Sequence, residues 1–183
     1  MEYYMTEFKK EQLMRRLGQF IFLLYVLVLI KTILFKFVTL GNLGGAFFTA
    51  SRNCNFIPFK SIADLFKNAS AGQALRNILG NILLFMPIGW LIPVATEYER
   101  EAPFFGLCIS IFFEVAQLAF AMGRTDVDDI ILNTLGALAG YIVYRITVKF
   151  IHSQFNITLL YTALTAALSA ALCIIMYIEG TLI

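Results

Sequence analysis

The residues best suited to chemistry lie in one short polar stretch between two long apolar segments. The stretch 123–129 contains the cation Arg124 and the carboxylates Asp126, Asp128 and Asp129. Ionisable groups at membrane depth are costly, so their presence between apolar segments indicates a functional site. Carboxylates can exchange protons or orient the amines and hydroxyls of a ligand, and an arginine can hold an anion. We therefore predict acid–base chemistry or binding of a polar headgroup here.

A purely structural interpretation of the three aspartates is also open. Thr125 or Asp126 would cap the helix that follows, and Asp129 would close a capping box. Acidic residues also suit the positive end of a helix dipole. Capping explains neither Arg124 beside the aspartates nor Asn133, which lies one turn beyond Asp129 on the same helix face.

Glu114 is the second unusual feature, because it lies inside an apolar segment with Gln117 three residues later on the same helix face. A lone ionised carboxylate there must be protonated, paired or hydrated. Pairing with Arg124, Arg76 or Lys31 would make it a bridge that locks helices together. Exposure in a polar cavity open to lipid would make it a general acid or base, or an acceptor for a headgroup. Both interpretations remain open.

Other polar side chains near the ends of apolar segments complete a candidate ligand-binding set. Its members are Arg52, Asn55, Arg76, Asn81, Gln117, Arg124 and Asn133. Arginine is the preferred partner for phosphate, so an amphiphile with an anionic head would suit this set. Carboxylates and amides also suit Mg²⁺ or Ca²⁺, but no histidine or cysteine joins them, and we predict no metal site. The residues leave any cofactor unidentified.

Composition indicates the fold class. The 183 residues are 60% hydrophobic and 14% charged, against about 25% charged in soluble proteins. The mean hydropathy is +0.78. Basic residues are scattered along the chain, which argues against nucleic-acid binding. These values predict an all-α, polytopic bundle of transmembrane helices.

About 20 apolar residues are needed for a helix to cross a bilayer. Five segments qualify: 17–38, 75–96, 103–122, 129–150 and 157–178. The first follows a basic cluster, and we expect an uncleaved membrane helix there rather than a signal peptide. Within the long connection 39–74, residues 61–68 predict an amphipathic helix lying in the membrane interface. We expect a four-helix membrane domain over 1–150, then a basic linker and an additional helix over 151–183.

Small residues predict how two of these helices pack. Gly136 and Gly140 form a GxxxG pattern, which lets helix backbones approach closely. In the last segment, four small residues at helical spacing predict a smooth packing face: Ala163, Ala166, Ala167 and Ala170.

Five spans place the two termini on opposite sides of the membrane, and every unusual polar residue then falls on the side opposite the N-terminus. Basic residues are divided equally between the two sides. The cluster before the first helix, which includes Lys9, Lys10, Arg15 and Arg16, favours a cytoplasmic N-terminus. The polar residues would then face outward.

Several motifs in order resemble the VanZ-like family. They are Asn55-Phe-Ile-Pro-Phe59, Asn81-Ile-Leu-Leu-Phe-Met-Pro87-Ile-Gly89, Glu114-Val-Ala-Gln117 and Arg124-Thr-Asp126-Val-Asp128-Asp129, followed by Asn133, Gly136 and Gly140. The resemblance covers about 20–148; Ile88 stands where the family commonly carries Phe. It implies a bacterial cell-envelope membrane protein associated with low-level resistance to teicoplanin and related lipoglycopeptides. It implies no particular reaction.

Three classes of function follow from these observations. The first is a protein that binds, and in a catalytic version modifies, a lipid-linked cell-wall precursor or a lipoglycopeptide at the outer face of the bacterial cell membrane. The second is a non-catalytic scaffold that docks a partner in wall synthesis. A transporter is a third and weaker class, because five spans leave little room for a pathway. Membrane lipids are expected partners, and the oligomeric state is left open.

Overall fold

The computed structural model describes residues 2–34, 53–120 and 124–178. These residues form, in order, α1 (Glu2–Leu34), β1 (Asn53–Asn55), α3 (Lys60–Asn68), α4 (Ala71–Ala95), α5 (Ala102–Phe120), β2 (Arg124–Asp126), α6 (Val127–Phe150) and α7 (Gln154–Ile178). Every described helix except α3 contains a stretch long and apolar enough to cross a membrane, which makes five candidate spans. The predicted all-α bundle is confirmed, and the chain is a multi-pass membrane protein.

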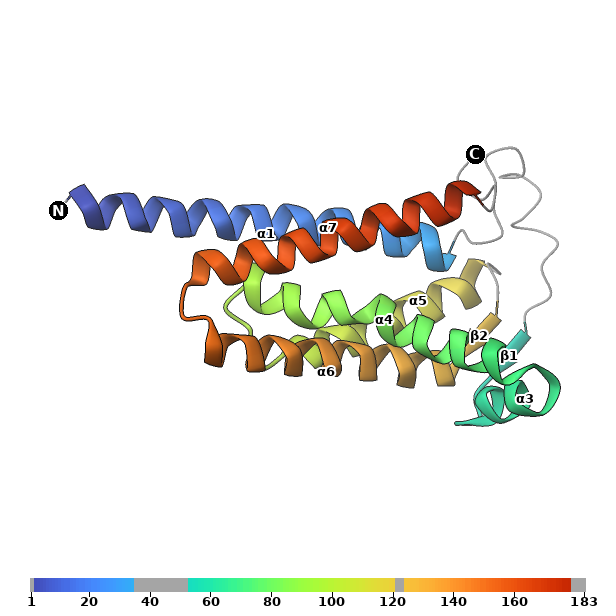
Figure 1. Ribbon diagram of the computed structural model, residues 1–183. Coiled ribbons are helices and arrows are strands. Elements are labelled where there is room, and N and C mark those ends of the chain that lie inside the picture. The colour runs from blue at the N-terminus through green and yellow to red at the C-terminus, as the bar shows by residue number, and fades with distance from the viewer. Residues whose placement is uncertain (1, 35–52, 121–123, 179–183) are drawn as a thin grey trace.

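Helices α4, α5, α6 and α7 begin one to four residues before their predicted segments, whereas α1 begins 15 residues before its own. Helix α4 begins at Ala71 because Ser70 forms a capping box: its hydroxyl accepts from the Gln73 backbone N–H, and the Gln73 side chain accepts from the Ser70 N–H. The amphipathic helix predicted at 61–68 is α3, which packs beside one end of the bundle (Figure 1). Predicted span residues 35–38 and 121–122 lie outside the described part.

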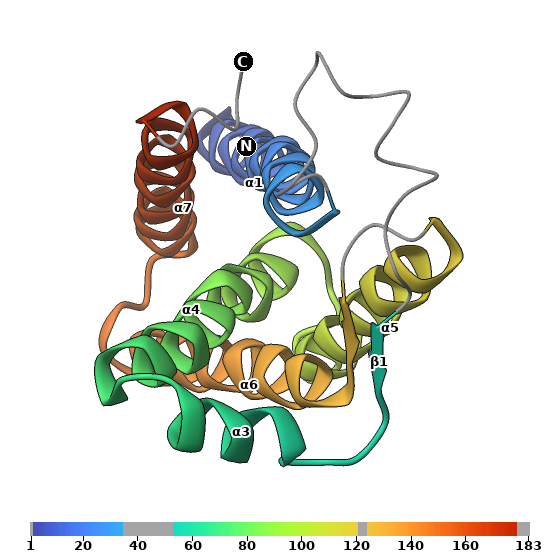
Figure 2. The same cartoon turned by 90° about the vertical axis from the view of Figure 1, so that its right-hand side faces the viewer.

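Helix α4 is the centre of the bundle, since it packs against α1, α5, α6 and α7. Figure 2 shows α6 crossing beneath α4, with α1 and α7 on the other side of α4. At the crossing, Gly136 and Gly140 of α6 lie directly against the Ile82 and Met86 carbonyls of α4, and Gly89 of α4 lies against the backbone of α6. The close approach predicted from the GxxxG pattern is confirmed.

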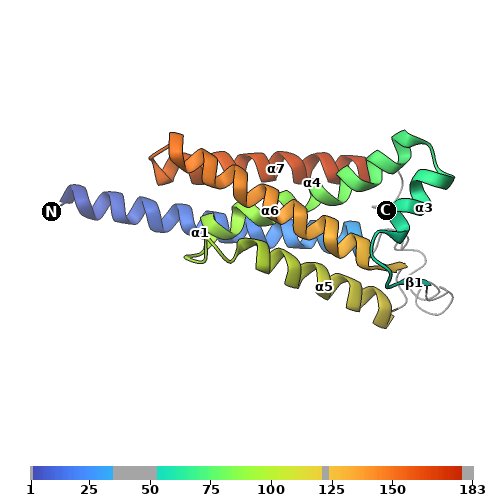
Figure 3. The same ribbon diagram turned by 90° about the horizontal axis from the view of Figure 1, so that it is seen from below.

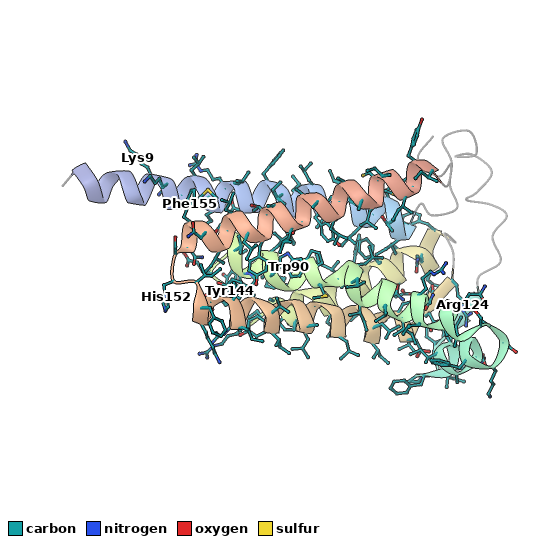
Figure 4. All side chains as sticks on the ribbon, in the orientation of Figure 1. Lys9, Trp90, Arg124, Tyr144, His152 and Phe155 are labelled. Carbon is teal, nitrogen blue, oxygen red and sulfur yellow. The ribbon has the colours of Figure 1, made fainter. Side chains whose placement is uncertain are left out.

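Helix α7 lies along α1 and also contacts α4. The Trp90 indole N–H donates to the Thr165 hydroxyl at 2.9 Å, and the Trp90 ring stacks on Tyr161 with centroids 5.4 Å apart. Figure 4 shows Trp90 and Tyr144 inside the bundle. The division of the chain into 1–150 and 151–183 stays a prediction.

The prediction of an alanine packing face on α7 is wrong. Ala163, Ala166, Ala167 and Ala170 are all exposed. The buried face instead carries hydroxyl-bearing side chains: Thr158, Tyr161, Thr162 and Thr165. A threonine hydroxyl in a helix can donate a hydrogen bond to the backbone carbonyl one turn earlier, as those of Thr162 and Thr165 do. Such residues are therefore compatible with a membrane-protein interior, and Thr165 can also receive the indole N–H.

The polar residues gather at one end of the bundle, as the predicted topology requires. Figure 4 places Arg124 at the end that carries α3, and Lys9 and His152 at the opposite end. Figure 3 shows the same end formed by α3, β1, the start of α6 and the end of α5. Segments far apart in the sequence therefore meet at a single face.

Candidate functional site

Two short strands join the motifs that the sequence places far apart. β1 and β2 pair in parallel, with Asn53 opposite Arg124, Cys54 opposite Thr125 and Asn55 opposite Asp126. This pairing was not predicted, because three-residue strands are too short to produce a recognisable alternation. It brings the Asn55 motif directly against the aspartate motif.

Asp126 is the N-cap of α6, because its carboxylate accepts from the Asp128 backbone N–H at 3.1 Å. The same carboxylate accepts from the Asn55 amide at 2.9 Å. The Asp126 backbone N–H donates to Glu114 Oε2 at 2.7 Å, so the capping box predicted with Asp129 is wrong. Glu114 takes the position that the Asp129 side chain would need.

Asp128 caps a different helix from its own. Its two carboxylate oxygens accept from the backbone N–H groups of Phe59 and Ile62, 69 and 66 residues earlier in the chain. These groups belong to the first turn of α3, whose N-cap Phe59 has a left-handed backbone (φ 63°) and offers no capping side chain. A carboxylate supplied from α6 therefore satisfies donors that would otherwise be unpaired. Asp128 is 1% exposed.

Asp129 is engaged least among the three aspartates. Within the described part of the chain, its carboxylate accepts a hydrogen bond from the Asn81 amide of α4, at 2.6 Å. One turn further along α6, the Asn133 amide donates to the Ser110 hydroxyl of α5 at 2.9 Å, and both residues are buried. Asn133 therefore joins α5 to α6 rather than joining the aspartates.

Arg124 lies across the open side of the site. Its guanidinium donates to the Ser61 hydroxyl at 2.6 Å, and its Nε lies 3.6 Å from Asp126 Oδ2. The Asn55 amide also donates to Ser61, at 3.0 Å. Ser61 was missed in the sequence, although its position at the start of the predicted amphipathic helix was a usable signal. It links α3 to both strands.

These elements enclose a cavity of about 450 Å³ at the end of the bundle. Its wall combines polar and apolar side chains: Ile33, Ser61, Ile62, Asp64, Leu65, Asn68, Ala69, Asn77, Gln117, Arg124, Asp126, Asp128, Asp129 and Leu132. Asp64, also missed in the sequence, pairs with Lys60 on the exposed side of α3. That hydrogen bond with the Lys60 ammonium holds the pKa of the Asp64 carboxyl below its usual value, so the group is charged at neutral pH.

The predicted site residues divide into four groups. Gln117, Arg124, Asp126, Asp128 and Asp129 line the cavity. Glu114, Asn55, Asn81 and Asn133 lie outside its wall and hold or adjoin it through the contacts above. Arg76 is exposed on α4 and does not line the cavity. Arg52 lies outside the described residues. Among the described residues, no group of three or more His, Cys, Asp or Glu side chains is arranged to hold a metal ion.

Glu114 is 4% exposed and its contact to the Asp126 N–H supports the loop that starts α6. We expect Glu114→Gln to be tolerated, because the amide oxygen can still accept from Asp126. Glu114→Leu should cost about 2 kcal/mol of stability, because it leaves that buried N–H without an acceptor. Thermal unfolding of the purified protein measures both changes. Loss of function in a stable Glu114→Gln protein would contradict the structural role and restore Glu114 as an acid or base.

Comparison with known proteins points in one direction. The family model described as VanZ/LLP1 matches residues 22–149. A curated relative, Protein VanZ from Enterococcus faecium, is 30% identical over 133 residues, covering 72% of this chain and 75% of the relative. No solved structure matches the chain significantly.

Proposed function

The chain belongs to the VanZ/LLP1 family, and from this membership we propose that it is a bacterial cell-envelope protein giving low-level resistance to teicoplanin and related lipoglycopeptides. In this proposal it acts by binding a lipid-linked or lipidated molecule in the cavity. In this proposal the N-terminus lies in the cytoplasm. The cavity then lies at the outer face of the membrane, where such antibiotics and their targets meet.

The single observation that carries the proposal is the mixed wall of the cavity. Its volume of about 450 Å³ lies in the range of small-molecule sites. Carboxylate, amide and guanidinium groups lie beside Ile33, Ile62, Leu65 and Leu132. A wall of this kind suits an amphiphile, whose polar head contacts the charged groups while its chain follows the apolar side chains toward lipid.

A chemical step within this proposal would use Asp129. The oxygens of Asp128 are occupied by α3, and those of Asp126 by Asn55, the Asp128 N–H and Arg124. Asp129 accepts a hydrogen bond from Asn81 and lines the cavity, so its carboxylate can also accept a proton from a ligand. Binding alone accounts for the proposed resistance, and a modification would add a new lipid or glycan species in cells.

The test measures teicoplanin and vancomycin inhibitory concentrations in a sensitive host that carries the native chain, Asp129→Asn or Arg124→Ala at matched membrane levels. Glu101→Gln, an exposed site at the other end of the bundle, is the control. We expect the native chain and the control to protect against teicoplanin more than vancomycin, and both cavity variants to lose protection. Equal protection against the two drugs, or full protection by both variants, would reject binding in the cavity.

A non-catalytic scaffold is the second candidate. Phe56, Ile57 and Phe59 are 69%, 61% and 61% exposed beside the site, and an exposed apolar cluster of this kind is typical of a contact surface. A wall-synthesis protein that co-purifies in stoichiometric amount with the native chain, and is lost when Phe56 and Phe59 are replaced by serine, would support this role.

A further inference from the structure

The carboxylates around the cavity outnumber its cationic groups. Asp64, Asp126, Asp128 and Asp129 line the wall, whereas Arg124 is the only arginine or lysine in it among the residues that the structure describes. Lys60 contacts Asp64 from the exposed side of α3 and neutralises one of the four. The wall therefore carries a surplus of negative charge, and an anionic head placed there would meet repulsion from several directions.

The charge of Arg124 is offset by a neighbouring carboxylate, which makes it a weaker anchor for an anion. Its guanidinium donates to Ser61 at 2.6 Å and lies 3.6 Å from the Asp126 carboxylate. This arrangement argues against the expectation that Arg124 holds an anion, since its charge is used to offset Asp126.

One acceptor in the wall lacks a partner. Among the described residues, Gln117 Oε1 is buried and receives no hydrogen bond. The Gln117 amide nitrogen donates to the Ile33 carbonyl at 3.3 Å, at the end of α1. Turning the amide over would set two oxygens against each other, so this contact fixes the orientation of the side chain. An unpaired buried acceptor is costly, and a donor from a ligand would satisfy it.

We infer that the cavity takes the cationic, hydrogen-bond-donating head of an amphiphile, such as a primary ammonium group, in preference to an anionic head. The ammonium donates to Asp129 and to Gln117 Oε1, while the apolar part of the amphiphile contacts Ile33, Leu65 and Leu132. This inference rests on the proposed function and names the class of molecule that the cavity binds.

The test titrates the purified full-length chain, in an uncharged maltoside detergent, with octylammonium, octyl phosphate and octanol by calorimetry. The three probes share one chain and differ in the head. We expect octylammonium to bind at least about tenfold more tightly than octyl phosphate or octanol, because only the ammonium head forms charge-assisted hydrogen bonds to a carboxylate. Tight binding of octylammonium should weaken as the salt concentration rises.

Two variants and a control locate the effect. Asp129→Asn should weaken octylammonium binding about tenfold with little change for octanol, because it removes one charge and keeps the size of the side chain. Gln117→Leu should weaken it several-fold and serves if Asp129→Asn fails to fold. Glu101→Gln removes the same charge at the opposite end and should leave binding unchanged.

Three outcomes would overturn the inference: preferential binding of octyl phosphate, equal binding of the three probes, or octylammonium binding that neither variant weakens. Preferential phosphate binding, together with loss of teicoplanin protection in Arg124→Ala, would leave the proposed function standing while removing the inferred cationic head. Ammonium-selective binding that depends on Asp129, without any teicoplanin protection by the native chain, would support the inference and reject the proposed function.

Discussion

Gly140→Ala should destabilise the protein by about 3 kcal/mol, because an added Cβ has no space at the crossing of α4 and α6. A Cβ at Gly140 would overlap the Met86 carbonyl oxygen, and one at Gly136 would overlap the Ile82 carbonyl oxygen. These obstacles are backbone atoms of a central helix, so relief requires the two helices to separate. Separation would loosen contacts along the whole interface, which is the largest in the bundle.

Gly80→Ala is the matched control for this prediction. Gly80 lies on α4, and nothing lies within 4 Å of a Cβ built there. Alanine favours a helix over glycine by about 1 kcal/mol, so this variant should be neutral or slightly more stable. Thermal unfolding in detergent measures both. Similar unfolding midpoints for Gly140→Ala, Gly80→Ala and the native chain would show that α4 and α6 do not need the close approach.

The crossing was foreseeable from sequence, whereas the docking of α7 was not. Glycines four residues apart on an apolar helix have a specific steric meaning, because little else allows backbones to touch. The alanines of α7 have no comparable meaning, since an alanine is acceptable both in an interface and toward lipid. Where α7 meets α4, Trp90 needs an acceptor for its indole N–H and finds Thr165. This requirement comes from another helix, so the periodicity of α7 alone does not predict it.

Prediction from sequence is limited in the same way for the single residues of the site. Apolar length places the spans, and the odd number of spans collects the polar residues at one end. The roles of Asp126, Asp128 and Asp129 differ although their sequence context is nearly the same. Asp128 faces the first turn of α3 and Asp129 faces Asn81 of α4. Which element each carboxylate meets depends on tertiary placement, so the Asp126 cap was predicted correctly, whereas the capping box with Asp129 was wrong and the Asp128 contact with α3 was missed.

Asp128→Ala should have a second large effect, through α3. The substitution leaves the backbone N–H groups of Phe59 and Ile62 without acceptors at the start of a nine-residue helix. Two charge-assisted hydrogen bonds are lost, which should cost about 3 kcal/mol. A helix this short is unstable without tertiary support, and Phe59 holds a left-handed backbone that the Asp128 contact stabilises. We expect α3 to detach while the long helices remain folded.

Amide hydrogen exchange over 59–69 measures this detachment directly. Exchange should rise by more than tenfold in Asp128→Ala. It should rise by an intermediate factor in Asp128→Asn, because the single amide oxygen can still accept from one of the two N–H groups. It should rise little in Asp64→Asn, which loses only an exposed pair with Lys60. Because α3 forms one wall of the cavity, octylammonium binding should fall in the same order. Unchanged exchange in Asp128→Ala would mean that the remaining contacts of Ser61 with Asn55 and Arg124 hold α3 on their own.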